Sequence, residues 1–427
     1  MHRTTIGIIA ALLVAAPAVA RDGSLLIRNA RVFDGARMLG SRDVLVQAGR
    51  ITAVARHIHA PSGIEVVDAK RRVLIPGLID GHVHVFPGAQ ADALRFGVTT
   101  LFDMYSLSDQ PTIERWRKQR AFDGEVGEAD TYTAAIGATP PGGHPTELMK
   151  DLPSEVPAPP TLASEDDADA FMRARVAGGS DYIKVVQDDG SRPGEGPSLS
   201  AFSPARFATV MAAAKATGKR VVVHVQRLAD AKLAVENGAD ALEHAVCDQL
   251  IGQAFAKAMK RKGVAQTATL ATYAGLAGLN DAQTLADDPE IAPYLSAQQR
   301  GMLGLIWKQP RANDYKIARA NVGRLARSGV TMIAGTDAPN PTTSFGPSLH
   351  LELLFLVQAG LTPTQALISA TSAPASFFHA DDRGRIAPGR KADMLLLDGD
   401  PTSDITATRR IRLMWKNGYA VSRKPSQ

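Results

Sequence analysis

Short apolar runs of β character alternate with helical patterns through most of the chain. Most of the runs are followed by a segment of helical periodicity, such as Pro204 to Gly218. Strands that alternate with helices about eight times are typical of an α/β fold, the (β/α)8 TIM-like barrel. A doubly wound open sheet is the structural alternative. The runs are Val73–Ile79, Val98–Asp103, Thr131–Ala135, Tyr182–Val186, Val221–Val225, Ala241–His244, Val264–Thr267 and Thr331–Gly335.

The two ends of the chain have a different pattern. Ser24–Asp34 and Asp43–Ala55 alternate apolar and polar residues, and so do Arg385–Asp398 and Arg410–Val421. Alternation of period two between turn signals is typical of strands. The expected units are therefore a β-sandwich in two parts, residues 21–76 and 381–427, and a barrel over residues 77–380.

The first twenty residues have the pattern of a signal peptide. An apolar stretch, Ile6 to Ala16, is followed by Ala18-Val19-Ala20, which fits an A-x-A cleavage site. An uncleaved membrane anchor is the alternative, but the stretch is short for a span. We expect a periplasmic or secreted protein that begins near Arg21 and has no stable membrane association. Its single cysteine, Cys247, excludes an intrachain disulfide.

Charge gives no support for nucleic-acid binding. The net charge is +5, and Lys and Arg are scattered rather than clustered or interleaved with aromatic residues. The expected partner is a small-molecule substrate. The sequence leaves the number of subunits open, a homo-oligomer included.

Polar residues that can bind metals fall at or near the ends of five of the apolar runs. The first run leads into two histidines at positions i and i+2, a spacing that points both side chains to one side of a strand. In a (β/α)8 barrel the catalytic groups lie at the carboxyl ends of the strands. We therefore expect these side chains to converge on one mouth. They are His82, His84, Lys184, His224, His244 and Asp337.

Taken singly, each of these residues has an ordinary explanation. A histidine in an apolar strand, such as His224, is usually a core residue with its hydrogen bonds satisfied. The same applies to His244, beside which Glu243 could be the functional group instead, and Asp337 could cap a helix. Lys184 is more informative, because an ammonium inside Ile-Lys-Val-Val must be paired, deprotonated or modified. A neutral amine can take up CO₂ to form a carbamate. The alternative is a lysine that extends to the barrel rim.

The octet Gly77–His84, Lys184, His224, His244 and Gly335-Thr336-Asp337 together resemble the amidohydrolase superfamily. More narrowly, they are similar to its binuclear branch of imidazolonepropionase-like proteins, prolidase-type dipeptidases and ochratoxin-hydrolysing amidases. The segment from Gly384 to Met394 is similar to the one by which such chains re-enter their β-sandwich. The resemblance implies two divalent metal ions, zinc first. It places one on His82, His84 and Asp337 and the other on His224 and His244, with a carboxylated Lys184 as bridge. The earlier pair His57-Ile58-His59 precedes the barrel and is expected to be structural.

One departure from the family pattern bears on the reaction. Family deaminases and imidazolonepropionase carry a glutamate three residues after the fifth-strand histidine, where this chain has Arg227. Lys184 also has no counterpart in the mononuclear deaminases. Both differences favour a binuclear hydrolase. The dipeptidase relatives commonly have a tyrosine where this chain has Gln226, which sets its substrate apart from theirs.

Three residues are candidates for substrate contacts. His144 follows two glycines in a long Pro- and Gly-rich connection, similar to the Gly-Gly-His of the same branch, though an exposed turn is the alternative. Arg227 could bind a substrate carboxylate in bidentate fashion, or be a surface arginine. Tyr273, after the seventh run, could line the pocket.

These features predict a binuclear metal-dependent amidohydrolase. The expected reaction is cleavage of an amide C–N bond, in an N-acyl amino acid or a dipeptide-like substrate, by a hydroxide that bridges the two metals. Asp337 is expected to act as general base and then general acid. The alternatives are a cyclic amide or lactone hydrolase on the same residues, a mononuclear deaminase and a non-catalytic binding protein.

Overall fold

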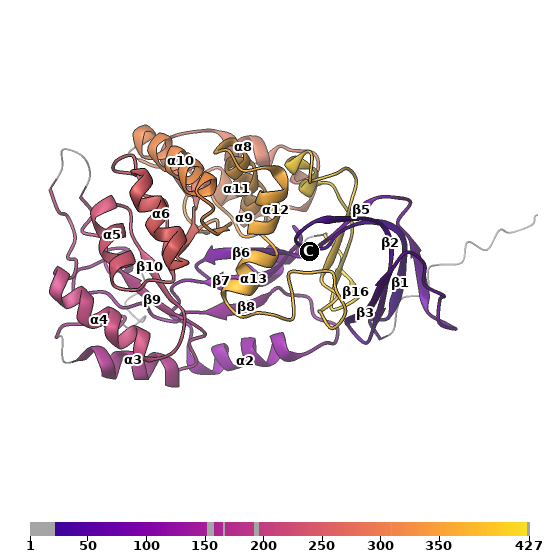
Figure 1. The fold of residues 1–427 in the computed structure, drawn as a ribbon, viewed down its shortest axis with the longest axis horizontal. Helices are drawn as coiled ribbons and strands as arrows, with labels where there is room; N and C mark the ends of the chain where they lie inside the picture. Colours follow the sequence, from indigo (N-terminus) through magenta and orange to yellow (C-terminus); the bar gives the residue numbers. More distant parts are fainter. Residues whose placement is uncertain (1–21, 152–157, 165–166, 192–195, 309, 425–427) are drawn as a thin grey trace, which may run out of the picture.

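The computed structural model describes residues 22–151, 158–164, 167–191, 196–308 and 310–424 (Figure 1). The predicted signal peptide, Met1 to Ala20, lies outside these ranges. Among the helices of the described part of the chain, none is long and apolar enough to cross a membrane.

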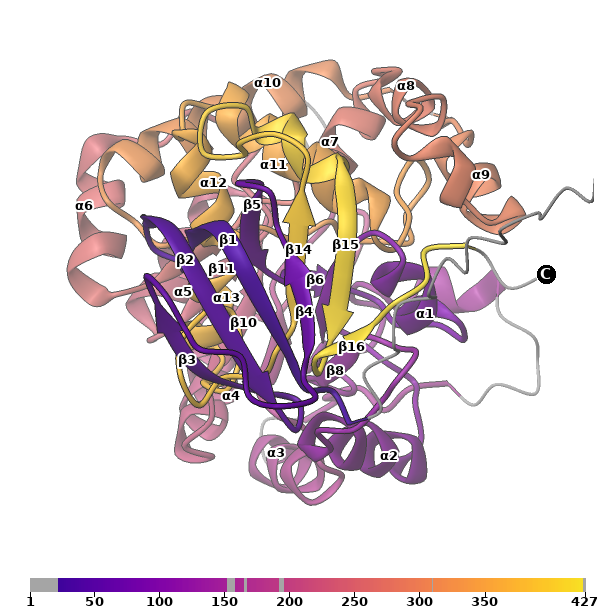
Figure 2. The same cartoon turned by 90° about the vertical axis from the view of Figure 1, so that its right-hand side faces the viewer.

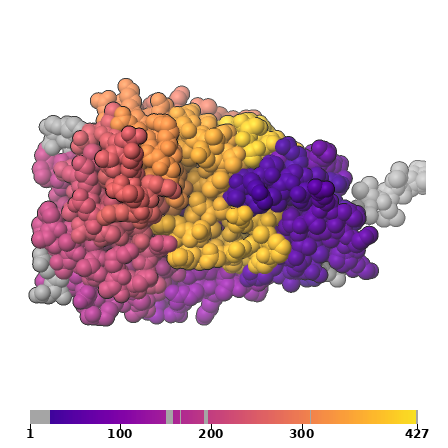
Figure 3. All heavy atoms as spheres, in the orientation of Figure 1, coloured from indigo at the N-terminus to yellow at the C-terminus, as the bar shows by residue number. Residues whose placement is uncertain are grey.

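Both ends of the chain build one eight-stranded sheet. Its order is β16-β15-β14-β5-β1-β2-β3, and β4 pairs with β1 (Figure 2). Figure 3 shows the two ends of the chain packed side by side on one face of the molecule. The two chain ends therefore share one sheet, while the predicted two-part β-sandwich stays a prediction. The strands are β1 (Leu25–Phe33), β2 (Met38–Gln47), β3 (Arg50–Ala55), β4 (Glu65–Asp68), β5 (Val73–Pro76), β14 (Met394–Leu397), β15 (Ile411–Lys416) and β16 (Tyr419–Ala420).

The first apolar run, expected as one barrel strand over Val73–Ile79, is divided between two sheets. Its first half is β5, which pairs antiparallel with β14 in the end sheet. Its second half begins β6 (Leu78–Val83), which pairs parallel with β7. Gly77 lies at the division, where a Cβ atom would come within 2.3 Å of the Thr99 hydroxyl oxygen. The close approach of Thr99 therefore leaves no room for a side chain at this point.

Eight parallel strands form the rest of the β structure, in two sheets ordered β6-β7-β8 and β13-β12-β11-β10-β9. Their order follows the sequence, without the reversal that defines a doubly wound sheet. Isolated parallel bridges, Val83 to Ala338 and Ala138 to Val185, connect the two sheets at both seams. The fold is therefore α/β and TIM-barrel-like. The further strands are β7 (Val98–Asp103), β8 (Asp130–Thr133), β9 (Ile183–Val186), β10 (Val221–His224), β11 (Ala241–Glu243), β12 (Ala265–Thr267) and β13 (Met332–Ile333).

Helices lie around these parallel strands, as Figure 1 shows for α2 to α6 and α10. β9 and β10 are buried along their whole length, as expected for parallel strands covered on both faces. Local signals set the helix ends: Ser203 caps α4 by accepting from the Arg206 N–H, and Gly263 ends α6 in a left-handed conformation. The helices are α1 (Ala89–Leu94), α2 (Gln110–Ala121), α3 (Ala168–Ala177), α4 (Pro204–Ala216), α5 (Leu228–Glu236), α6 (Gln253–Lys262), α7 (Leu270–Leu276), α8 (Asp281–Ala286), α9 (Ala297–Leu303), α10 (Ala312–Arg327), α11 (Pro347–Gln358), α12 (Pro363–Ser369) and α13 (Ser372–Phe377).

A buried ionic network joins the end sheet to the parallel strands. Asp130, the first residue of β8, accepts from Arg383 at 2.6 Å and from Lys416 at 2.8 Å. Lys416 also donates to Asp393 at 2.9 Å. The side chains of Asp130 and Lys416 are fully buried, so this pairing takes place away from water.

Candidate metal centre

The six predicted metal ligands lie toward one end of the parallel strands. His82 and His84 stand at and just after the end of β6, His224 ends β10, and His244 follows β11. Because all these strands run in the same direction, their carboxyl ends meet at one edge. Lys184 lies inside β9. Asp337 follows β13 and directly precedes Ala338, which forms a bridge to Val83 of β6.

The histidine rings form a continuous group. The His82 ring lies 5.4 Å from that of His84 and 4.7 Å from that of His244, measured between ring centroids. The His224 ring lies 4.4 Å from that of His244. All four predicted histidine ligands are therefore brought together.

Asp337 lies among these rings. Its Oδ1 is 3.1 Å from His84 Nε2 and 3.4 Å from His82 Nε2. Ligand atoms of His82, His244 and Asp337 all lie within 4.8 Å of one another, close enough to hold one ion. Burial opposes ionisation of Asp337, but its interactions with His82 and His84 keep the pKa of this carboxyl well below its usual range. The tightest group thus combines His82 and Asp337, expected on one ion, with His244, expected on the other.

Two of the imidazoles have a partner on their Nδ1 atom. His82 Nδ1 lies 2.6 Å from the carboxylate of Glu243, and His84 Nδ1 lies 3.3 Å from the main-chain carbonyl of Tyr105. The other nitrogen of His82, Nε2, is buried and makes no hydrogen bond within the described residues. Both histidines therefore direct Nε2 toward Asp337.

The other two imidazoles are also held on one nitrogen. His224 Nε2 lies 3.2 Å from Asp188, and His244 Nδ1 lies 2.9 Å from the Thr269 hydroxyl. Burial, together with nearby histidines and Lys184, lowers the pKa of both His224 and His244 well below the usual value. Metal ions bind the neutral imidazole, so these two side chains are in the protonation state that coordination requires.

Lys184 is buried and its Nζ has no hydrogen-bond partner among the described residues. Burial lowers the pKa of its amine to about 8, although the charges of Glu243, Asp337 and Asp103 act in the opposite direction. A buried polar atom without a partner is uncommon in a folded protein and calls for a missing ligand or a modification.

The backbone is strained at two of the ligands. His244 has a φ of +70° and Asp337 a φ of +59°, in the left-handed region that non-glycine residues rarely adopt. Thr269, which contacts His244, has a φ of +51°. Strain of this kind clusters at functional sites, where surrounding structure maintains it, and here it accompanies the ligand positions.

His144 also reaches the centre. Its ring lies 4.8 Å from that of His224, and its Nδ1 lies 2.6 Å from the carboxylate of Glu147. Its side chain is 27% exposed, so one side of the ring faces solvent. The Gly-Gly-His segment therefore lies beside the metal ligands, where a substrate would have to approach.

The other two predicted substrate contacts already have partners within the protein. The Arg227 guanidinium donates to Asp189 at 2.5 Å and to the Ser191 hydroxyl at 2.9 Å. The Tyr273 hydroxyl donates to the Ala245 carbonyl at 2.7 Å, beside His244. Arg227 would have to exchange partners to bind a substrate carboxylate, and Tyr273 supports the main chain next to a ligand.

Residue patterns alone missed Asp188 and Thr269, and they did not predict that Glu243 is the partner of His82. Glu243, Asp188 and Thr269 hold ligand imidazoles, and only Glu243 carried a signal, as an acid within an apolar strand. The second histidine pair lies in the connection after β3, where His57 is 67% exposed and stands 3.5 Å from Asp43. It takes no part in the group around Asp337.

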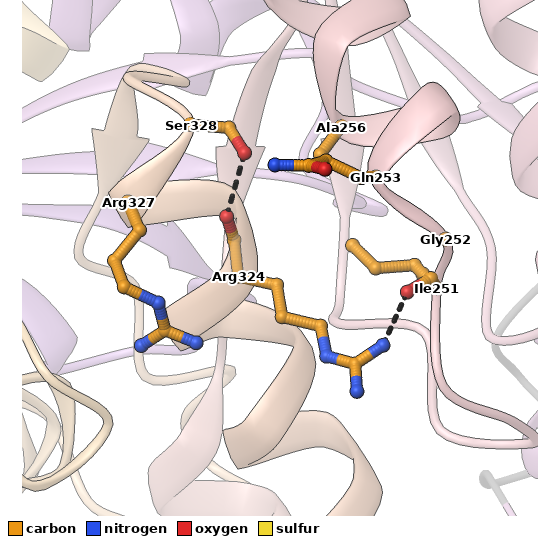
Figure 4. A pocket seen from close by; sticks show the side chains of 7 residues that line it. All are labelled: Ile251, Gly252, Gln253, Ala256, Arg324, Arg327 and Ser328. Atoms are coloured by element: carbon orange, nitrogen blue, oxygen red, sulfur yellow. Dashed lines mark hydrogen bonds between the residues drawn. The ribbon is translucent and has the colours of Figure 1, made fainter.

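A separate surface cavity of about 350 Å³ lies between α6 and α10 (Figure 4). Arg324 donates to the Ile251 carbonyl at 2.5 Å, and the Ser328 hydroxyl donates to the Arg324 carbonyl at 2.9 Å. None of the six predicted ligands lines this cavity, so it is distinct from the metal centre.

Comparison with known proteins agrees with this geometry. Residues 73–421 match the model of the Amidohydrolase family. The chain is 26% identical to an imidazolonepropionase of Cutibacterium acnes, over 89% of this chain and 87% of the relative. Among solved structures, a putative prolidase from Bifidobacterium longum has a TM-score of 0.73 at 20% identity, covering 96% of this chain and 97% of that one. The ochratoxinase of A. niger has a TM-score of 0.69 at 19% identity, covering 93% and 95%. The chain belongs to the amidohydrolase family and is a hydrolase that acts on carbon–nitrogen bonds.

Proposed function

We propose that the protein is a binuclear metal-dependent amidohydrolase that cleaves the amide bond of an N-acyl amino acid or a dipeptide-like substrate. The observation that carries this proposal is a pair of buried nitrogen atoms, His82 Nε2 and Lys184 Nζ, that make no hydrogen bond within the described residues, in a group where His82 Nε2 lies 3.4 Å from Asp337 Oδ1. One ion would be held by His82, His84 and Asp337, the other by His224 and His244, with a carboxylated Lys184 between them.

The donor atoms fit zinc. Imidazole nitrogen and carboxylate oxygen are the ligands that zinc prefers in catalytic sites, although manganese and cobalt accept the same set. A bound divalent ion supplies Lewis-acid polarisation of the scissile carbonyl and lowers the pKa of bound water. The protein supplies the ligand positions, through the hydrogen bonds that fix each imidazole.

Asp337 is the residue that moves the proton. Its low pKa keeps it ionised at neutral pH, so it can accept a proton from the attacking water. It can then deliver that proton to the leaving nitrogen. Its Oδ1 lies between two ligand imidazoles, which fixes the carboxylate at the centre of the group.

The substrate would approach past His144. The His144 side chain is 27% exposed and its ring contacts that of His224, so it is suited to contact the group around the scissile bond. A free carboxylate on the substrate would replace Asp189 as the partner of Arg227 and bind its guanidinium group in bidentate fashion.

The pairing of Arg227 with Asp189 favours one alternative. A cyclic amide or lactone needs no bound carboxylate, so its hydrolysis on the same metal residues would leave that pair intact. A mononuclear deaminase has less support, because it would leave Lys184 buried without a role.

We also propose that the mature protein is periplasmic or secreted. The support is the apolar stretch and the A-x-A site within the first twenty residues.

Metal analysis and a substrate panel test the proposed activity. The purified full chain is assayed for bound metal and then for hydrolysis of N-acyl amino acids, dipeptides, lactams and lactones, before and after chelation. We expect two ions per chain, and activity on amides that chelation abolishes and added zinc restores. A chain that binds no divalent metal, or that hydrolyses amides equally well after complete removal of metal, would exclude the proposal.

A further inference from the structure

Glu243 is a fully buried acid that lies within the metal centre without being one of its predicted ligands. It ends β11, and its carboxylate is 2.6 Å from His82 Nδ1. The other carboxylate oxygen accepts from the Thr267 hydroxyl at 3.2 Å. The side chains of His82 and Glu243 are 1% and 0% exposed, so no solvent competes for this contact.

We propose that Glu243 is the positioning residue that fixes His82 as a metal ligand, an inference that rests on the proposed metal-dependent function. A carboxylate oxygen can accept the hydrogen of an imidazole N–H, and in this arrangement His82 Nδ1 is the donor to Glu243. The proton on Nδ1 leaves the lone pair on Nε2, the atom that has no hydrogen bond and lies 3.4 Å from Asp337 Oδ1. Such outer partners orient ligand histidines and increase their basicity.

The position of Glu243 is set by the sheet. It is paired in register with Thr267 of β12 and with His224 of β10, so neighbouring parallel strands hold it on both sides. The hydroxyl of Thr267 therefore fixes the carboxylate from the adjacent strand. Glu243 acts through His82 and is not expected to touch the substrate.

A purely structural role for Glu243 is the competing explanation. Removing a partner from a buried hydrogen bond destabilises a fold even when no ligand is involved. Glu352 of α11 provides a matched control, because it is also a fully buried glutamate and accepts from the Ala271 N–H at 2.8 Å. Within the described residues, no imidazole is hydrogen-bonded to the Glu352 carboxylate.

The test compares the full chain with Glu243→Gln and Glu352→Gln. Each protein is stripped of metal, and its affinity for zinc and for cobalt is measured by competition with a chromogenic chelator. Melting of the metal-free proteins is recorded alongside. We expect Glu243→Gln to weaken metal binding by about 10- to 100-fold, and to alter the visible spectrum of the bound cobalt. Glu352→Gln should leave metal affinity and spectrum unchanged.

The possible results separate the two claims. If the wild-type chain takes up no metal, the proposed function fails and the positioning role fails with it. If wild type and Glu243→Gln bind metal equally, and only the melting temperature falls, the positioning role alone is overturned. Should Glu243→Gln not fold, Thr267→Val removes the second support of the carboxylate, and it should weaken metal binding less than tenfold but measurably. Unchanged affinity in that variant would count against the inference.

Discussion

The Nε2 atom of His84 and the Oδ1 atom of Asp337 lie 3.1 Å apart, although 253 positions separate the two residues in the sequence. The contact crosses the seam where β6 meets the segment after β13. Two main-chain hydrogen bonds hold this seam beside it, from Asp337 N to the His82 carbonyl and from His84 N to the Ala338 carbonyl, each 2.8 Å long. The first and last parallel strands are thus bound together at the metal centre.

Replacement of Asp337 by asparagine should remove most of the activity. Asparagine is nearly the same size but cannot accept the proton from water, and general acid–base groups contribute about 10²- to 10⁴-fold to rate. We expect kcat to fall within that range, measured on the best amide of the substrate panel, and metal content to fall as well. Asp404→Asn, at an exposed pair with Arg410, serves as the control. Full activity of Asp337→Asn would remove this residue from the mechanism.

Replacement of Lys184 by alanine distinguishes a binuclear hydrolase from a mononuclear deaminase. The hydrolase should lose both metal content and activity, because the variant lacks the bridging ligand. A deaminase should keep one tightly held ion and its turnover. Metal content per chain and initial rates give the answer, with the exposed Lys257→Ala as control. A Lys184→Ala protein that hydrolyses amides like wild type would contradict the proposed mechanism.

Much of this centre could be predicted from the sequence because strand ends are local features. His82, His84 and His224 each stand at the end of an apolar run, and the parallel fold brings such ends together. The partners of these imidazoles could not be predicted, because Glu243 of β11 reaches His82 of β6 from a strand in the other parallel sheet rather than through any spacing along the chain. The division of the first apolar run at Gly77 was missed for a similar reason. The run contains Pro76-Gly77, a dipeptide that marks turns, but only the pairing of β5 with β14 shows that its two halves belong to different sheets.

The stability of the protein should depend on pH through Glu352. Burial raises the pKa of this carboxyl to about 8, so it stays protonated in the folded chain while the unfolded chain ionises above about 4.5. The contribution of Glu352 to the free energy of unfolding of the wild-type protein therefore falls as the pH rises from about 4.5 to about 8. Glu352→Gln cannot ionise and should gain on the order of 1–3 kcal/mol over wild type at pH 8, but little at pH 4.5. Urea unfolding at both values measures this difference. If the free energies of unfolding of Glu352→Gln and wild type differ by the same amount at both pH values, Glu352 is ionised in the folded protein.

The ionic network at Asp130 should be sensitive to the loss of its carboxylate. Burial opposes ionisation of Asp130, but Lys416 and Arg383 hold its pKa well below the usual range. Asp130→Asn removes the buried carboxylate that both cations share and leaves Lys416 with Asp393 and Arg383 with Asp382. Breaking a buried ion pair costs about 3–5 kcal/mol of unfolding free energy. Because the folded pKa is lowered, the contribution of this group is present above about pH 4 and is lost in more acidic solution.

Denaturant titrations at neutral pH measure the effect of Asp130→Asn. The control is Glu128→Gln, which removes an exposed pair with Arg115 at 3.8 Å and should cost less than about 1 kcal/mol. Equal costs for the two variants would mean that the buried network contributes no more than a surface pair.

The sheet that both chain ends share has a consequence for the order of events in folding. β14 stands between β5 and β15, so the sheet that begins at residue 25 lacks a central strand until residues 394–397 are available. During synthesis, one edge of β5 stays unpaired until more than three hundred further residues have been added. Contacts of such long sequence separation form slowly, and open strand edges invite association between chains. The N-terminal strands therefore depend on the final segment of the polypeptide, and truncation there should release an aggregation-prone sheet edge.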